Sequence, residues 1–229
     1  DEQKKIGYIR ITTFSRHTSD EVRSAMQQLA AGGVKGLILD LRWNPGGLLT
    51  SAIEIADFFV ADGRIVSTAG RNTPERKWEA KKEGTFEGFP IAVLVNHSSA
   101  SASEILSACL QDHKRAVVIG ERTWGKGSVQ NIIELDDGKS AMKLTTAGYR
   151  RPSGQNIHRE EGAKDSDEWG VKPSDGFEVK LTDTEVEEYF TERRARDVIA
   201  ARPQESPAAR KHDKQVQKGI EYLNQQLAK

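Results

Sequence analysis

Hydrophobic and polar positions follow two different periods along this chain, and each period predicts one kind of element. Residues 6–14 alternate between apolar and polar side chains and are rich in β-branched and aromatic residues, which predicts a strand. Short apolar runs at 36–41, 64–68, 91–95 and 115–119 predict buried strands. Helical patterns occupy several of the intervals between these runs.

Three helices are predicted between the strands. The first opens at Thr18, because Thr18 and Glu21 have the spacing of a capping box, and it ends at the glycine pair 32–33. The second is expected over about 48–60. The third follows the strand at 91–95, and its apolar residues recur at the spacing of one helix face. They are Ala102, Ile105, Leu106, Cys109 and Leu110.

Two stretches predict paired strands. Residues 128–135 and 140–149 have strand character and are joined by Asp136-Asp-Gly138, which is a strong hairpin signal. The polar stretch 70–89, which contains Trp78, is interpreted as a second hairpin that lies over a cleft.

Strands that alternate with helices are typical of an α/β domain whose sheet has both faces covered. The end of the chain is charged and helical, with helices at about 183–199 and 213–228 around a linker rich in proline, serine and alanine at 202–210. We therefore expect residues 1–182 to form one core domain and residues 183–229 a helical C-terminal extension.

Charge and composition exclude several classes of function. Lys and Arg together number 34, as do Asp and Glu, so the net charge is zero and no basic stripe predicts a nucleic-acid partner. The longest apolar runs fall well short of the ~18 residues that a membrane-spanning helix needs. The five histidines form no pair at helical spacing and the single cysteine, Cys109, adds no thiolate cluster, so no metal site is predicted.

Ser101 lies where the strand at 91–95 gives way to the third helix. At such a position the hydroxyl is exposed on a turn, close to free backbone N–H groups and to the positive end of the helix dipole. These are the donors that the oxyanion of an acyl-transfer reaction needs. By itself, the run Ser99-Ala-Ser-Ala-Ser103 is equally typical of a helix cap or a close packing contact.

A serine hydroxyl needs a base to take its proton, and Lys126 is a candidate for that base. It lies between Gly125 and Gly127, which permit tight bends. A lysine acts as a general base only when burial lowers its pKa from the reference value of about 10.4, and we expect surrounding apolar residues to bury this one. A bend near Gly127 would bring the Gln130 amide to the Lys126 amine.

A phosphate-binding loop is an alternative interpretation of this glycine-rich segment. The residues from Gly120 to Lys126 nearly match that motif. The motif requires Ser or Thr after the lysine, however, and Gly127 follows here. The residues after it also have strand rather than helix character.

A Ser-His-Asp triad is a second alternative. The base would be His97 or His113 and its partner Asp40 or Asp112. The Gly-x-Ser-x-Gly elbow is missing, since Ser101 lies between two alanines. At 1.5 Å per helical residue, His113 would lie about 18 Å from Ser101.

Taken together, these segments resemble the catalytic region of the carboxyl-terminal processing proteases, which are tail-specific serine peptidases with a Ser–Lys dyad. The intervals of 25 residues from Ser101 to Lys126 and 4 residues to Gln130 agree with that family, and the resemblance spans roughly residues 5 to 183. The matching pieces are Ser99-Ala-Ser-Ala-Ser-Glu104, Gly120-Glu121, Gly125-Lys-Gly127, Val129-Gln130 and a glycine turn in Leu39-Asp-Leu-Arg-Trp-Asn-Pro-Gly-Gly47.

The resemblance implies a fold and a role for each matching residue. The core would be of the crotonase and Clp-protease kind, built from repeated strand–strand–helix units, and no cofactor would be needed. Ser101 would be the nucleophile, Lys126 the general base and Gln130 the residue that orients it. The backbone N–H groups that hold the oxyanion would be those of Gly46 or Gly47 and of Ala102.

The resemblance also implies a setting. Substrates would be proteins or peptides cut near their carboxyl ends, in the periplasm or cell envelope, and a homo-oligomer is compatible with this role. The family usually carries a PDZ domain ahead of its core, and nothing before Ile6 could be one. We therefore expect the PDZ domain to lie N-terminally in the full-length protein; the alternative is that this member lacks it. The alternative is a non-catalytic binding or assembly module on the same fold. The joint presence of serine, lysine and glutamine favours the peptidase.

Overall fold

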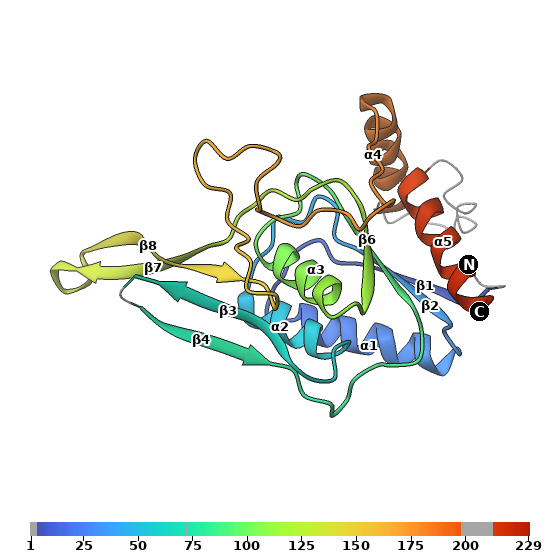
Figure 1. Cartoon of the computed structure of the whole chain (residues 1–229), viewed down its shortest axis with the longest axis horizontal. Coiled ribbons are helices and arrows are strands. Elements are labelled where there is room, and N and C mark those ends of the chain that lie inside the picture. Colours follow the sequence, from blue (N-terminus) through green and yellow to red (C-terminus); the bar gives the residue numbers. More distant parts are fainter. Residues whose placement is uncertain (1–3, 72, 198–212) are drawn as a thin grey trace.

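Two four-stranded sheets organise the chain, and Figure 1 shows helices packed around one while the other extends away to the left. The computed structural model describes residues 4–71, 73–197 and 213–229. The first sheet is parallel, with the order β1-β2-β5-β6. Its strands are β1 (Ile6–Arg10), β2 (Gly36–Asp40), β5 (Ile91–Val95) and β6 (Ala116–Gly120).

The strands of the parallel sheet are buried on both faces, as their continuous apolar runs predict. In β2, Leu37 and Leu39 belong to one hydrophobic cluster, whereas Ile38 between them belongs to the cluster that contains Val216 and Leu223 of α5. Because side chains alternate along a strand, this division places three helices on one face and α5 on the other. The helices are α1 (Thr18–Ala31), α2 (Leu49–Asp57), α3 (Ala102–Asp112) and α5 (Lys214–Leu227). The predicted α/β class is confirmed.

The capping box predicted at the start of α1 is wrong. The N-cap is His17, whose side chain makes no cap hydrogen bond, and Thr18 is already the first helical residue. The Thr18 hydroxyl instead accepts the Ser15 N–H at 3.0 Å in the preceding turn. At α3, by contrast, the Glu104 side chain does reach back to the N-cap and accepts the Ser101 N–H at 2.7 Å.

The second sheet is antiparallel, with the order β4-β3-β8-β7. The predicted hairpin is confirmed: β7 and β8 are joined through Asp136–Gly138, where all three residues have positive φ. The polar stretch 70–89 contributes β4, which pairs with β3 at the edge of this sheet. The strands are β3 (Arg64–Gly70), β4 (Thr73–Glu79), β7 (Ser128–Leu135) and β8 (Ser140–Arg150).

The C-terminal helices are α4 (Asp183–Asp197) and α5. Through Val216 and Leu223, α5 covers the face of the parallel sheet opposite α1, α2 and α3. The linker predicted at 202–210 lies outside the described residues. No helix in the described part of the chain is both long and apolar enough to cross a bilayer.

Candidate active site

Ser101 lies at the turn between β5 and α3, with a backbone conformation that is rare outside glycine (φ 56°, ψ −113°). It is half-buried. Its neighbours Ser99 and Ser103 are fully buried, and their hydroxyls donate to the carbonyl oxygens of Leu41 at 2.8 Å and Asn44 at 2.9 Å. Ser101 is therefore the serine of this run that is accessible to a substrate, while the other two hold the turn in place.

A buried carboxylate, Glu104, joins the Ser101 turn to the Lys126 loop. Its Oε2 accepts the backbone N–H groups of Ser101 at 2.7 Å and Lys126 at 2.8 Å. Its Oε1 accepts the Gly125 N–H and the Thr123 hydroxyl, each at 2.6 Å. Because the two backbone nitrogens share one oxygen atom, the Ser101 and Lys126 backbones lie beside each other.

Glu104 is a positioning group that the sequence analysis missed. Burial raises the pKa of Glu104, and the four hydrogen bonds that it accepts act in the opposite direction. A sequence signal was present, because Ser101 and Glu104 have the same capping-box spacing that was assigned to Thr18 and Glu21.

The glycine turn packs directly against Ser101. Gly46 has φ +98°, and a Cβ there would lie 2.8 Å from the Ser101 Cβ and 2.9 Å from the Ala102 nitrogen, so only glycine permits this approach. The Gly46 N–H donates to the Asn44 side-chain oxygen at 2.9 Å and is therefore already paired. In the described part of the chain, the N–H groups of Gly47 and Ala102 have no recorded acceptor. These are the two N–H groups beside Ser101 that remain unpaired among these residues.

Lys126 is exposed, so the burial expected for its amine is wrong for this structure. The reason lies in the flanking glycines, which are buried: a Cβ on Gly125 would meet Trp169 at 3.0 Å, and one on Gly127 would meet the His158 nitrogen at 2.4 Å. The loop packs through these glycines and leaves the lysine side chain outside.

Gln130 is also exposed, and its amide nitrogen donates across the β7–β8 hairpin to the Thr145 hydroxyl at 2.6 Å. Among the described residues, no hydrogen bond is recorded from Lys126 Nζ to Ser101 or to Gln130. The structure thus brings together the backbones of Ser101 and Lys126, and the side-chain roles of Lys126 and Gln130 stay predictions.

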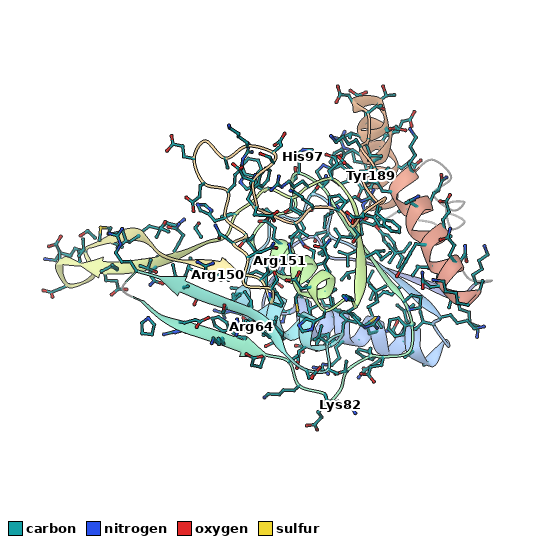
Figure 2. All side chains as sticks on the ribbon, viewed as in Figure 1. Arg64, Lys82, His97, Arg150, Arg151 and Tyr189 are labelled. Atoms are coloured by element: carbon teal, nitrogen blue, oxygen red, sulfur yellow. The ribbon has the colours of Figure 1, made fainter. Side chains whose placement is uncertain are left out.

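The Ser-His-Asp alternative is not assembled. His97 is 65% exposed and its Nδ1 lies 3.1 Å from a Glu121 oxygen; Figure 2 shows it at the upper edge of the molecule. His113 lies at the far end of α3 from Ser101, with Nε2 at 2.7 Å from the Arg64 carbonyl oxygen. Both candidate aspartates are engaged in ion pairs with arginines.

The structure also argues against a phosphate-binding loop. The residues after Lys126 form β7, whereas a phosphate-binding loop is followed by a helix. Within the described ranges, no group of three or more His, Cys, Asp or Glu side chains is arranged to hold a metal ion.

Known proteins share both the sequence and the fold. The profile of Peptidase family S41 matches residues 5–173. The chain is 45% identical over 157 residues to the carboxy-terminal-processing protease of Bartonella bacilliformis, covering 66% of this chain and 36% of that protein. It is 40% identical over 173 residues to the carboxy-terminal processing protease CtpA of Bacillus subtilis, covering 75% and 35%.

Among solved structures, the photosystem II D1 C-terminal processing protease has a TM-score of 0.67 and 36% identity, covering 77% of this chain and 42% of that one. The chain therefore spans about a third of the length of the curated relatives that it matches.

Proposed function

Because this chain belongs to peptidase family S41, we propose that it is a serine endopeptidase that cleaves protein substrates near their carboxyl ends. The observation that carries the proposal is the setting of Ser101. Its half-buried side chain lies at the start of α3, its backbone is tied through Glu104 to that of Lys126, and Gly46 packs against it.

In the proposed reaction, Ser101 Oγ attacks the scissile carbonyl carbon and Lys126 Nζ takes the hydroxyl proton. The backbone N–H groups of Gly47 and Ala102 stabilise the oxyanion. We assign this role to Gly47 rather than Gly46, whose N–H is already paired. Lys126 then protonates the leaving amine, and water hydrolyses the acyl-enzyme.

The exposed lysine suggests that the substrate completes the site. General-base catalysis by a lysine requires that water be excluded from its amine. Two apolar side chains are exposed beside the site: Leu48, 43% exposed, follows Gly47, and Trp124, 61% exposed, precedes the lysine loop. We propose that a peptide lying between them covers Lys126 and that Gln130 orients the amine in that state.

Hydrolysis of an unstructured protein tests this function. The chain is incubated with β-casein, and with one peptide made with either a free or an amidated carboxyl end, and the products are identified by mass spectrometry. We expect the unaltered chain to cleave β-casein and both forms of the peptide, and to cleave the form with the free carboxyl end faster. The Ser101→Ala variant should cleave none of them.

The exposure of Lys126 favours one second candidate, a non-catalytic binding or assembly module. That function predicts binding of the same peptides without cleavage by the unaltered chain, and this result would overturn the peptidase proposal.

We further propose that the full-length protein carries a PDZ domain ahead of this segment and works in the periplasm or cell envelope. Its relatives include bacterial proteins and a chloroplastic C-terminal processing peptidase, and this chain spans about a third of their length, which supports both points. Fractionation of cells that express the full-length protein tests the location. Recovery with the cytosolic fraction would contradict it.

A further inference from the structure

The helical C-terminal extension, residues 183–229, lies beyond the residues that match the family profile. It nevertheless contacts Arg42 and Trp43, which directly precede the glycine turn. Asp213 is the N-cap of α5 and accepts the Val216 N–H at 3.1 Å. The same carboxylate accepts two hydrogen bonds from Arg42, 171 residues earlier in the chain, at 3.0 Å from Nη1 and 2.8 Å from Nη2. Arg42 lies two residues before Asn44, where the Asn-Pro-Gly-Gly turn begins.

Arg42 is fully buried, and its charge is tolerated because the whole guanidinium is paired. Asp40 accepts from Nε at 3.0 Å and from Nη2 at 2.7 Å, and Gln215 accepts from Nη1 at 2.9 Å. Arg42 is thus held between β2 and the start of α5. Loss of either aspartate would leave part of a buried charge unpaired, which is costly.

Trp43 is held from the same side. Its φ of 55° is unfavourable for a bulky residue and persists only where the surroundings fix it. The ring stacks on Tyr189 of α4 at a centroid distance of 4.3 Å, and Phe190 packs edge-on at 5.0 Å. Figure 2 shows Tyr189 where α4 meets the rest of the molecule. The Trp43 N–H donates to the Asn96 side-chain oxygen at 2.9 Å.

Arg42 and Trp43, which the C-terminal extension contacts, directly precede Asn44, and Asn44 is hydrogen-bonded to the Ser101 turn. The Asn44 carbonyl oxygen accepts the Ala100 N–H at 3.0 Å and the Ser103 hydroxyl at 2.9 Å, and the Asn44 side chain accepts the Gly46 N–H. A displacement at Arg42 or Trp43 would therefore move the turn relative to Ser101.

We infer that Asp213 and Tyr189 are positioning residues for the glycine turn: they hold Arg42 and Trp43, and so set where the Gly47 N–H lies relative to Ser101. The inference rests on the proposed function, since it gives the C-terminal segment a part in the same reaction. It does not make the two residues catalytic, because neither touches a reacting atom.

Asp213→Asn tests the inference. Asparagine caps a helix as well as aspartate does, so α5 keeps its start, but Arg42 loses a negative partner and faces N–H donors. We expect kcat to fall about 10- to 100-fold with KM changed less than about twofold, because the turn acts on the transition state. The backbone N–H groups of Trp43, Asn44 and Gly46, which donate to Asn96, Leu41 and the Asn44 side chain, should exchange with deuterium about tenfold faster.

The matched control is Glu185→Gln, which removes an ion pair between Glu185 of α4 and Lys214 of α5 without touching Arg42. It should leave kcat and exchange at residues 43–47 unchanged. Tyr189→Leu removes the stacked ring and should lower kcat, and the conservative Tyr189→Phe, which keeps the ring, should restore it. This second pair decides the matter if Asp213→Asn does not fold.

A normal kcat in Asp213→Asn and in Tyr189→Leu would overturn the inference, whether or not the melting temperature falls, because the segment would then only stabilise the fold. Failure of the proposed function is a separate result. If the unaltered chain cleaves nothing, deuterium exchange at residues 43–47 still tests whether Asp213 holds the glycine turn, and unchanged exchange in Asp213→Asn would overturn the inference.

Discussion

Replacing Glu104 by glutamine should separate the two halves of the site. The carboxylate accepts four hydrogen bonds, two at each oxygen, and all four partners are donors. Glutamine has the same shape but carries one acceptor oxygen and one NH₂ group. In one orientation the NH₂ group faces the N–H groups of Ser101 and Lys126. In the other it faces the Gly125 N–H and the Thr123 hydroxyl.

Neither orientation is free of cost. The Thr123 hydroxyl oxygen already accepts the Val171 N–H at 2.8 Å, so it cannot easily turn to accept from the amide as well. Two buried donors therefore lose their acceptor, at about 1–3 kcal/mol each, while removal of a buried charge offsets part of this. We expect the free energy of unfolding to fall by about 3 kcal/mol and kcat to fall about 100-fold, since Ser101 and Lys126 lose their common anchor.

Urea denaturation and peptide hydrolysis measure the two effects. Glu121→Gln is the matched control, because it makes the same chemical change at a carboxylate whose recorded partner is the exposed His97, and it should change stability by less than about 0.5 kcal/mol. Unaltered stability and kcat in Glu104→Gln would refute the reasoning.

Three further predictions concern other parts of the site. Burial alone would raise the pKa of Asp40, but the charge of Arg42 and hydrogen bonds outweigh it and hold that pKa below its usual value. The stability that Asp40 contributes is therefore present above about pH 4, and it is lost as the pH falls through the lowered pKa of the folded state. Acid unfolding of Asp40→Asn should accordingly depend less steeply on pH than that of the unaltered chain, and equal slopes would contradict this. Gly46→Ala should reduce kcat more than about 100-fold, because the new Cβ would lie within 3 Å of the turn that carries Ser101. Gly154→Ala, with a similar positive φ but nothing within 4 Å of the new Cβ, should keep activity. Equal loss of activity in both variants would implicate backbone strain instead. Lys126→Arg should be as inactive in peptide hydrolysis as Lys126→Ala, because arginine stays protonated, and full activity would show that the residue acts only through its charge.

Features that depend on local sequence could be predicted. The strand at Ile91–Val95 was predicted with its observed bounds, because all five of its residues are apolar. Both faces of this strand are buried, since Val93 belongs to one hydrophobic cluster and Leu94 to the other. The β7–β8 hairpin could likewise be predicted, because Asp136-Asp-Gly138 tolerates the positive φ that its turn requires.

Features that depend on distant contacts could not be predicted. Whether Lys126 is buried depends on what packs against its flanking glycines, and those partners lie about 30 to 45 residues further along, at His158 and Trp169. The contact of Asp213 with Arg42 spans 171 residues and has no local pattern. Arg42 forms ion pairs with Asp40, two residues earlier, and with Asp213, and nothing in the sequence indicated the second partner.

The central claim is that Ser101 is an activated nucleophile, and covalent labelling tests it most directly. A fluorophosphonate reacts with a serine only where a base and an oxyanion site assist it, and tandem mass spectrometry locates the adduct. We predict an adduct on Ser101, none on Ser99 or Ser103, and little labelling in Lys126→Ala. An adduct on another residue, or labelling of Ser101 at an undiminished rate in Lys126→Ala, would contradict the account.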